Sequence, residues 1–173
     1  MAGGPPSGPG QLRVREATRV DVPAIHALVL ALAEYERAPD EVVATPHDLA
    51  AALFADTPRA WALVAEEDGR VIGFALWFVT YSTWVGRHGM WLEDLFVLPE
   101  RRGAGVGRAL LAELARICVQ RDYRRLEWNV LDWNEPALRF YRSLDASALD
   151  EWTVHRLTGP ALARLASSAQ SRS

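Results

Sequence analysis

The hydrophobic positions of this 173-residue chain change their period several times, and each change marks a predicted element. Residues 12–15 alternate between apolar and polar and predict a first strand. Apolar side chains then recur at helical spacing in residues 18–35 and 45–54, which predict two helices. Residues 60–66 and 71–81 are predicted to form the two strands of a hairpin around the turn Glu67-Asp68-Gly69-Arg70.

The second half of the chain continues to alternate between strand and helix patterns. The predicted elements are a strand at 91–97, a helix at 106–121, a strand at 125–131, a helix at 134–144, a strand at 152–157 and a short helix at 160–165. This order predicts a mixed α/β fold with one central sheet and flanking helices. No repeat or linker divides the pattern, so we expect one domain over residues 11–168. The Gly/Pro-rich residues 1–10 are expected to be disordered and do not have the pattern of a signal peptide.

A glycine-rich loop connects the strand at 91–97 to the helix that follows. Its sequence is Leu98-Pro99-Glu100-Arg101-Arg102-Gly103-Ala104-Gly105-Val106-Gly107-Arg108. Alternate glycines allow backbone N–H groups to approach an anion closely, and the helix brings its positive dipole end to the same place. Arg101, Arg102 and Arg108 are possible counter-charges. The loop therefore predicts a pyrophosphate site, with a ligand-free turn as the alternative; the Lys-Ser or Lys-Thr of a P-loop and the spacing of a dinucleotide fingerprint are both missing.

Several motifs together resemble the GNAT family of N-acetyltransferases. Residues 102–107 fit the pattern Arg/Gln-x-x-Gly-x-Gly/Ala of its coenzyme A loop, and residues 134–141 fit its Asn-x-x-Ala-x-x-x-Tyr pattern. Tyr-Ser-Thr-Trp-x-Gly-Arg at 81–87, Leu-Glu-Asp-Leu-Phe-Val at 92–97 and Val-Leu-Asp-Trp-Asn at 130–134 are similar to the diamine acetyltransferase group. Ser-Thr-Trp and Leu-Asp-Trp-Asn favour its thialysine branch over its spermidine/spermine branch. The resemblance implies a single-domain GNAT fold with splayed central strands, acetyl-CoA as cofactor, a small primary amine as substrate and a homodimer.

The resemblance also implies which residues bind the two substrates. The cofactor-binding set is Leu95, Phe96, Val97, Arg102, Gly103, Ala104, Gly105, Val106, Gly107, Arg108, Asn134, Pro136, Ala137 and Tyr141. The amine-binding set is Tyr35, Glu36, Ser82, Trp84, Glu93, Glu127, Trp128 and Asn129. Asp145-Ala146 stands where the family usually has Gly-Ala, and Asp tolerates the left-handed conformation that this position needs.

Glu93 and Tyr141 are the candidate catalytic residues. A lysine-like amine is mostly protonated at neutral pH, so the site must hold a cation, remove its proton and return a proton to the leaving thiolate. Glu93 and Asp94 lie next to each other, and in a regular strand they would point to opposite faces. Only one of them would then face the amine, and we favour Glu93. The resemblance assigns Tyr141 as the general acid.

Composition excludes several other classes of protein. The net charge of −3 gives no electrostatic case for nucleic acid, and no apolar run is long enough for a membrane span. A single cysteine, Cys118, favours the cytoplasm. The four histidines are scattered, which gives no metal site. Most of the seven tryptophans are expected in the core, with Trp84 and Trp133 as candidates to bind an ammonium group. A peptide or protein N-acetyltransferase and a non-catalytic acyl-CoA-binding module are the alternative functions.

Overall fold

The computed structural model describes residues 10–170, so that residues 1–9 of the segment 1–10 expected to be disordered lie outside this range. The chain divides into two compact units, one up to Asn129 and one from Val130 onward. In the first unit the helices and strands are β1 (Arg13–Glu16), α1 (Val22–Tyr35), α2 (Pro46–Phe54), β2 (Trp61–Glu67), β3 (Arg70–Ser82), β4 (Arg87–Val97), α3 (Val106–Gln120) and β5 (Leu126–Glu127). The predicted mixed α/β fold with one sheet is confirmed.

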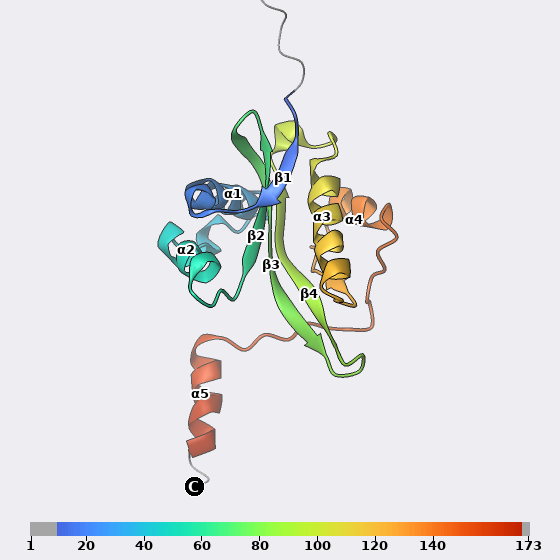
Figure 1. Ribbon diagram of the computed structural model, residues 1–173. Helices are drawn as coiled ribbons and strands as arrows, with labels where there is room; N and C mark the ends of the chain where they lie inside the picture. The colour runs from blue at the N-terminus through green and yellow to red at the C-terminus, as the bar shows by residue number, and fades with distance from the viewer. Residues whose placement is uncertain (1–9, 171–173) are drawn as a thin grey trace, which may run out of the picture. The chain divides into compact units, whose positions relative to one another are not determined.

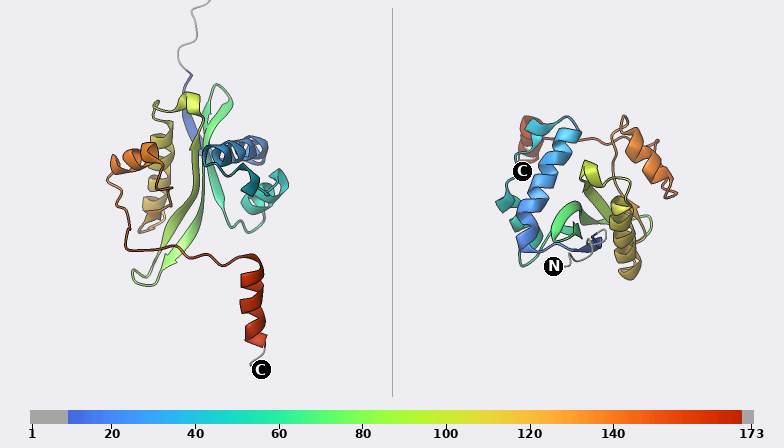
Figure 2. Two further views of the ribbon diagram at one scale, coloured as in Figure 1. Left: turned by 180° about the vertical axis from the view of Figure 1, so that it is seen from behind. Right: turned by 90° about the horizontal axis from the view of Figure 1, so that it is seen from above.

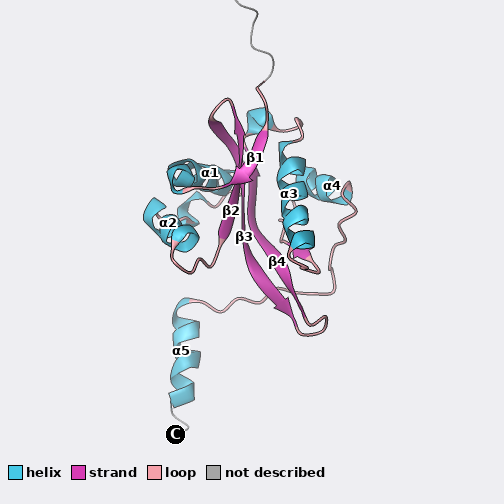
Figure 3. Cartoon of the chain, in the orientation of Figure 1, coloured by secondary structure: helices cyan, strands magenta, loops and turns pink. Residues whose placement is uncertain are grey.

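The five strands form one sheet in the order β1-β2-β3-β4-β5 (Figure 3). The first four are antiparallel neighbours, and β4 and β5 pair in parallel. Helices α1 and α2 cover one face of this sheet, and α3 covers the other (Figures 1 and 2). We refer to these as the α1 face and the α3 face.

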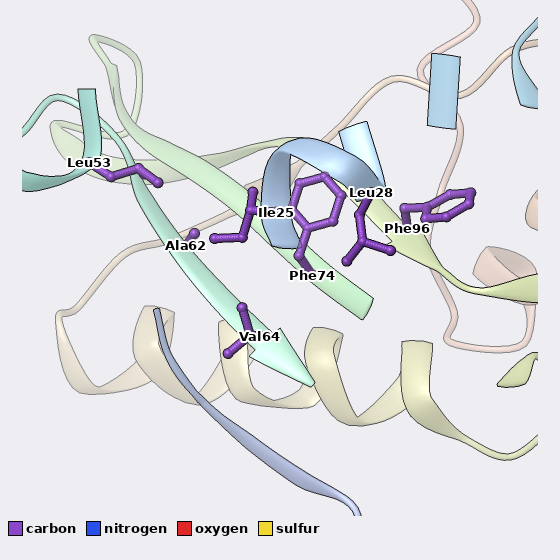
Figure 4. Close-up of a cluster of buried hydrophobic side chains, with 7 residues drawn as sticks. All are labelled: Ile25, Leu28, Leu53, Ala62, Val64, Phe74 and Phe96. Atoms are coloured by element: carbon purple, nitrogen blue, oxygen red, sulfur yellow. The ribbon is translucent and has the colours of Figure 1, made fainter. Parts of the chain in front are cut away.

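The core on the α1 face is a cluster of buried apolar side chains contributed by five elements. Its members are Ile25, Leu28, Leu53, Ala62, Val64, Phe74 and Phe96 (Figure 4). Burial of a side chain the size of Leu or Phe stabilises the fold by about 1.5–3 kcal/mol. The cluster therefore fixes α1 against β2, β3 and β4, and with it the position of the residues at the end of α1.

The starts of the helices follow local capping rules. In α2, Thr45 accepts a hydrogen bond from the backbone N–H of Asp48, whose carboxylate accepts one in return from Thr45. Before α1, Asp21 is buried and accepts a hydrogen bond from Thr18. It also accepts two hydrogen bonds from the guanidinium of Arg15, at 2.7 Å and 2.9 Å. Arg15 also donates to Glu66 of β2. This network fixes the beginning of α1 to β1 and β2.

A β-bulge interrupts β4. Trp77 of β3 lies opposite Leu92, and the next residue back, Leu76, lies opposite Asp94, so that Glu93 is the extra residue. Leu76 packs against the core of the α1 face. Since directly opposed residues share a face, Asp94 lies on the α1 face. Met90 contacts Cys118 of α3, whereas Phe96, six residues later, packs against α1. Residues six apart in a regular strand face the same side, so one extra residue must lie between them.

The pairing between β4 and β5 is short. Met90 lies opposite Leu126 and Trp91 opposite Glu127, and β5 then ends. The predicted strand at 125–131 is therefore wrong in its length, because the chain leaves the sheet after two paired residues. In the described chain, residues 92–97 of β4 consequently have a strand neighbour only on the β3 side, in agreement with the expected splaying.

The second unit contains two helices, α4 (Glu135–Arg142) and α5 (Gly159–Gln170). Asn134 caps α4 as predicted: it accepts a hydrogen bond from the backbone N–H of Ala137. The predicted strand at 152–157 is wrong, since this segment is irregular. Its alternating Trp152 and Val154 are about 70% exposed. Alternation makes a strand only where a neighbouring strand and a core can use it.

Candidate active site

Three carboxylates gather on the α1 face beside the bulge: Glu36, Glu93 and Asp94, which we call the carboxylate cluster. Glu36 directly follows α1, and the other two lie on β4. Burial, the charge of Glu93 and the charge of Glu36 raise the pKa of Asp94 to about 6. Partial burial also raises the pKa of Glu36. The bulge therefore overturns the expectation that only one of Glu93 and Asp94 can face this site.

Within the described chain, no arginine, lysine or histidine forms an ion pair with any member of the carboxylate cluster. One hydrogen bond reaches it, from the indole Nε1–H of Trp91 to the Glu93 carboxylate at 3.0 Å. A group of negative charges without a cation of its own is suited to binding a cationic ligand.

The glycine-rich loop has the conformation that its sequence predicts. Gly103 and Gly105 have φ values of +80° and +84°, which side chains with a Cβ rarely adopt. Gly105 is the N-cap of α3, and no side chain caps that end. This end of the 15-residue helix therefore has its positive dipole end and first backbone N–H groups without a side-chain cap, which fits the pyrophosphate of coenzyme A.

Arg101 and Arg102 both contact other parts of the first unit. Arg101 forms an ion pair with Glu67 at 2.7 Å. The guanidinium of Arg102 lies over the rings of Tyr35, at 4.6 Å, and Phe96, at 5.3 Å, and its Nε donates to the Val97 carbonyl. Arg102 therefore contacts Tyr35, the last residue of α1, directly before Glu36 of the carboxylate cluster. Arg108 is exposed on the first turn of α3.

Ser82 and Trp84 lie apart from the carboxylate cluster. Ser82 is buried in the turn of the β3–β4 hairpin, where its hydroxyl accepts a hydrogen bond from the Val85 N–H. Trp84 is 89% exposed at the tip of this hairpin. Ser82 pairs with Arg87, six residues before Glu93 and therefore roughly 20 Å away along the strand. In a single chain the structure does not bring these two predicted amine contacts to the cluster.

Glu127 lies beside the cluster. It is opposite Trp91 across the parallel β4–β5 pair, and its carboxylate forms an ion pair with Arg125 at 2.7 Å. Trp128 and Asn129 follow directly, after the end of β5. Glu127 therefore differs from the three carboxylates of the cluster, because its negative charge is already paired with the guanidinium of Arg125.

The remaining candidates belong to the second unit. Asn134 is buried as the cap of α4, and Pro136 and Ala137 lie in its first turn. Tyr141 is half-buried in the last turn, with its ring 5.4 Å from that of Phe140. Asp145 has a φ of +59°, so the left-handed position expected there is confirmed.

The tryptophans differ from expectation. Of the seven, only Trp77 is buried, while Trp84, Trp133 and Trp152 are exposed. In the part of the chain that the structure describes, no helix is long and apolar enough to cross a membrane. The same residues contain no group of three or more His, Cys, Asp or Glu that could hold a metal ion.

Comparison with protein families identifies the chain. Residues 25–145 match the model of the acetyltransferase (GNAT) family. The chain belongs to this family. The GNAT chain is 37% identical to thialysine N-epsilon-acetyltransferase of Bos taurus over 164 residues, which are 88% of this chain and 96% of that protein. It is 31% identical to L-ornithine N5-acetyltransferase of Arabidopsis thaliana, with 87% and 86% of the two chains covered.

Solved structures agree with this assignment. An integron cassette protein from the mobile metagenome of V. cholerae superposes on this GNAT chain with a TM-score of 0.75 and 28% identity, over 90% of this chain and 97% of the other. The protein is therefore an N-acetyltransferase of the GNAT type, a family whose enzymes use acetyl-CoA as the acetyl donor.

Two features of this site were missed from the sequence. The prediction for Asp94 fails because it rests on a regular strand, in which Glu93 and Asp94 would face opposite sides. Trp91 is outside the predicted set, although it lies two residues before Glu93 on one strand, and residues i and i+2 share a face.

Proposed function

We propose that this GNAT enzyme transfers the acetyl group of acetyl-CoA to a primary amine of a small lysine-like or diamine substrate. The observation that carries the proposal is the carboxylate cluster, in which Glu36, Glu93 and Asp94 lie together without an ion-pair partner among the described residues. An ammonium group would supply the missing positive charge. Relatives named for thialysine and L-ornithine acetylation support an acceptor of this kind.

The first task of the site is to bind and deprotonate the amine. An ammonium group of pKa about 10.4 is almost fully charged at neutral pH, so the cluster binds the cation first. Glu93 then accepts a proton from it, directly or through water. Glu36 and Asp94 keep the local potential negative while the neutral amine attacks the acetyl carbon.

The second task is to hold the acetyl donor and complete the transfer. Acetyl-CoA supplies an acetyl group activated as a thioester. The loop from Arg102 to Arg108 and the N-terminus of α3 would hold its pyrophosphate, and the backbone N–H groups of residues 95–97 would hydrogen-bond its pantetheine arm. Tyr141 donates its phenolic proton to the departing thiolate. Transfer is direct in a ternary complex, with no acetylated enzyme.

The motif differences from spermidine/spermine enzymes favour a short acceptor. Ser82 stands where those enzymes carry an Asp, so one anchor for the distal amine of a polyamine is missing. Because Ser82 lies roughly 20 Å along the strand from Glu93 of the same chain, it would act on that amine from the partner subunit of a dimer. The test is thiol release from acetyl-CoA with thialysine, lysine, ornithine, diaminopropane, spermidine and a peptide with a free N-terminus. We expect turnover on thialysine or a short diamine and little on spermidine. Preference for the peptide would support the alternative of a peptide N-acetyltransferase, and acetyl-CoA binding without any turnover would support a non-catalytic module.

We further propose that the enzyme is a cytoplasmic homodimer. The large apolar side chains that the second unit exposes support self-association: Leu149, Trp152, Val154, Leu157, Leu162 and Leu165. Sedimentation at several protein concentrations tests this, and a single species of 19.2 kDa would contradict it.

A further inference from the structure

Trp91 is the one residue whose side chain donates a hydrogen bond to the carboxylate cluster within the described chain. Its indole Nε1 lies 3.0 Å from Oε2 of Glu93. An indole N–H donates and cannot accept, and it carries no charge. It can therefore fix the carboxylate in one orientation without cancelling the negative charge that an ammonium group would need.

The surroundings of Trp91 hold its ring in place. On one side it lies opposite Phe78 of β3, with the ring centroids 6.4 Å apart. On the other side it lies opposite Glu127 of β5, whose carboxylate is occupied by Arg125. Trp91 is half-buried between these neighbours, whereas Glu93 is exposed. A restrained donor thus acts on a side chain that would otherwise sample several rotamers.

The bulge explains why Glu93 needs such a support. As the extra residue of β4, Glu93 has no partner opposite it on β3. The cross-strand packing that fixes the other side chains of this strand is therefore missing at this position. Repulsion from Asp94 would favour rotamers that carry the Glu93 carboxylate away from the cluster.

We propose that Trp91 is a positioning residue that holds the Glu93 carboxylate at the acceptor site through the indole N–H. The proposal rests on the proposed function, since it assigns to Glu93 the role of proton acceptor. Trp91 itself does not touch the reacting atoms.

Trp91→Phe tests the proposal, because it keeps an aromatic ring beside Phe78 and removes the N–H. We expect kcat with the best amine to fall about tenfold, while KM for acetyl-CoA and the thermal midpoint stay unchanged. Trp61→Phe is the matched control: Trp61 lies on β2, stacked on Trp77 at 4.8 Å, outside the proposed machinery. Its turnover should equal that of the unmodified protein.

The decisive comparison is made in a Glu93→Ala background. If Trp91 acts through Glu93, Trp91→Phe causes no further loss of kcat there, and the two effects are not additive. The same tenfold loss in both backgrounds would overturn the proposal, and so would an unchanged kcat in the single variant.

A spectroscopic measurement separates this proposal from the proposed function. The indole N–H resonance of Trp91, assigned by its absence in Trp91→Phe, should move when Glu93 is replaced by Ala. If no amine is acetylated, the proposed function fails, and the resonance alone decides about the hydrogen bond. A resonance that does not respond to Glu93→Ala overturns the inference even in an active enzyme.

Discussion

Replacing Asp94 with Asn should make the protein more stable at neutral and alkaline pH. Asp94 is half-buried beside the bulge, and the charges that act on it, from Glu93 and Glu36, are both negative. Asn keeps the shape of the side chain and removes its charge. The native state then no longer contains a carboxylate that burial and repulsion disfavour.

The size of the effect follows from the pKa of Asp94, about 6 in the folded protein against an ordinary value of 3.8 for an aspartate in water. At 1.36 kcal/mol for each pH unit, this difference corresponds to roughly 3 kcal/mol. Screening by water at a half-buried site reduces it, and we expect a gain of about 1–3 kcal/mol in the free energy of unfolding. Because the folded pKa is raised, the native state binds more protons than the unfolded state between pH 4 and 6. The penalty in the unmodified protein therefore appears as pH rises through this window.

Urea unfolding from pH 4 to pH 8 measures the effect. The stability of the unmodified protein minus that of Asp94→Asn should be near zero at pH 4 and become negative above pH 6. Glu36→Gln serves as a comparison, since it removes one repulsive neighbour and should give a smaller gain. Equal stability of the two proteins at pH 8, or a gain of the same size at all pH values, would show that the negative charge of Asp94 does not destabilise the folded protein.

Three further predictions concern other parts of the chain. Asp21→Asn should lower the free energy of unfolding at pH 7 by about 2 kcal/mol, since hydrogen bonds from Arg15 hold the pKa of Asp21 at about 2. The loss should shrink as pH falls below 4, and urea titrations at pH 7 and pH 3 test this. Gly105→Ala should cost about 1–2 kcal/mol in urea unfolding and weaken acetyl-CoA binding in calorimetry, because a Cβ is strained at a φ of +84°; unchanged binding would remove the loop from the cofactor site. Tyr141→Phe should lose most of its turnover in a thiol-release assay and still bind acetyl-CoA, whereas full activity would exclude a general acid at this position.

Most elements of the first unit could be predicted from the sequence because local rules decide them. Helix α2 begins at Pro46 after a Thr45–Asp48 capping box, and the hairpin of β2 and β3 turns at Asp68-Gly69, both with φ values above +50°. Such signals lie within a few residues of the element that they predict. They needed no knowledge of distant parts of the chain.

The parts that could not be predicted depend on distant neighbours. β5 ends at Glu127 because the chain diverges from β4, and residues 152–157 form no strand because no strand lies beside them in the second unit. Residues 91–97 do not alternate strictly, since Glu93 and Asp94 stand side by side between apolar residues, and this pattern does not show that one of the two is an extra residue. The expectation that Glu93 and Asp94 face opposite sides is wrong for this reason. The expectation that only one carboxylate faces the site is wrong with it.

The bulge also shows that the charged site could be changed without changing which side chains form the core. Removal of Glu93 would join Leu92 directly to Asp94, and β4 would then alternate without interruption. Met90 and Leu92 would still face α3, and Asp94 and Phe96 would still face α1, so no apolar side chain would change layers. A chain one residue shorter at this point should fold as a more regular sheet and lose the carboxylate that we propose as the proton acceptor. Glu93 is in this sense an insertion into a complete strand, one that a deletion could reverse without rebuilding the protein around it.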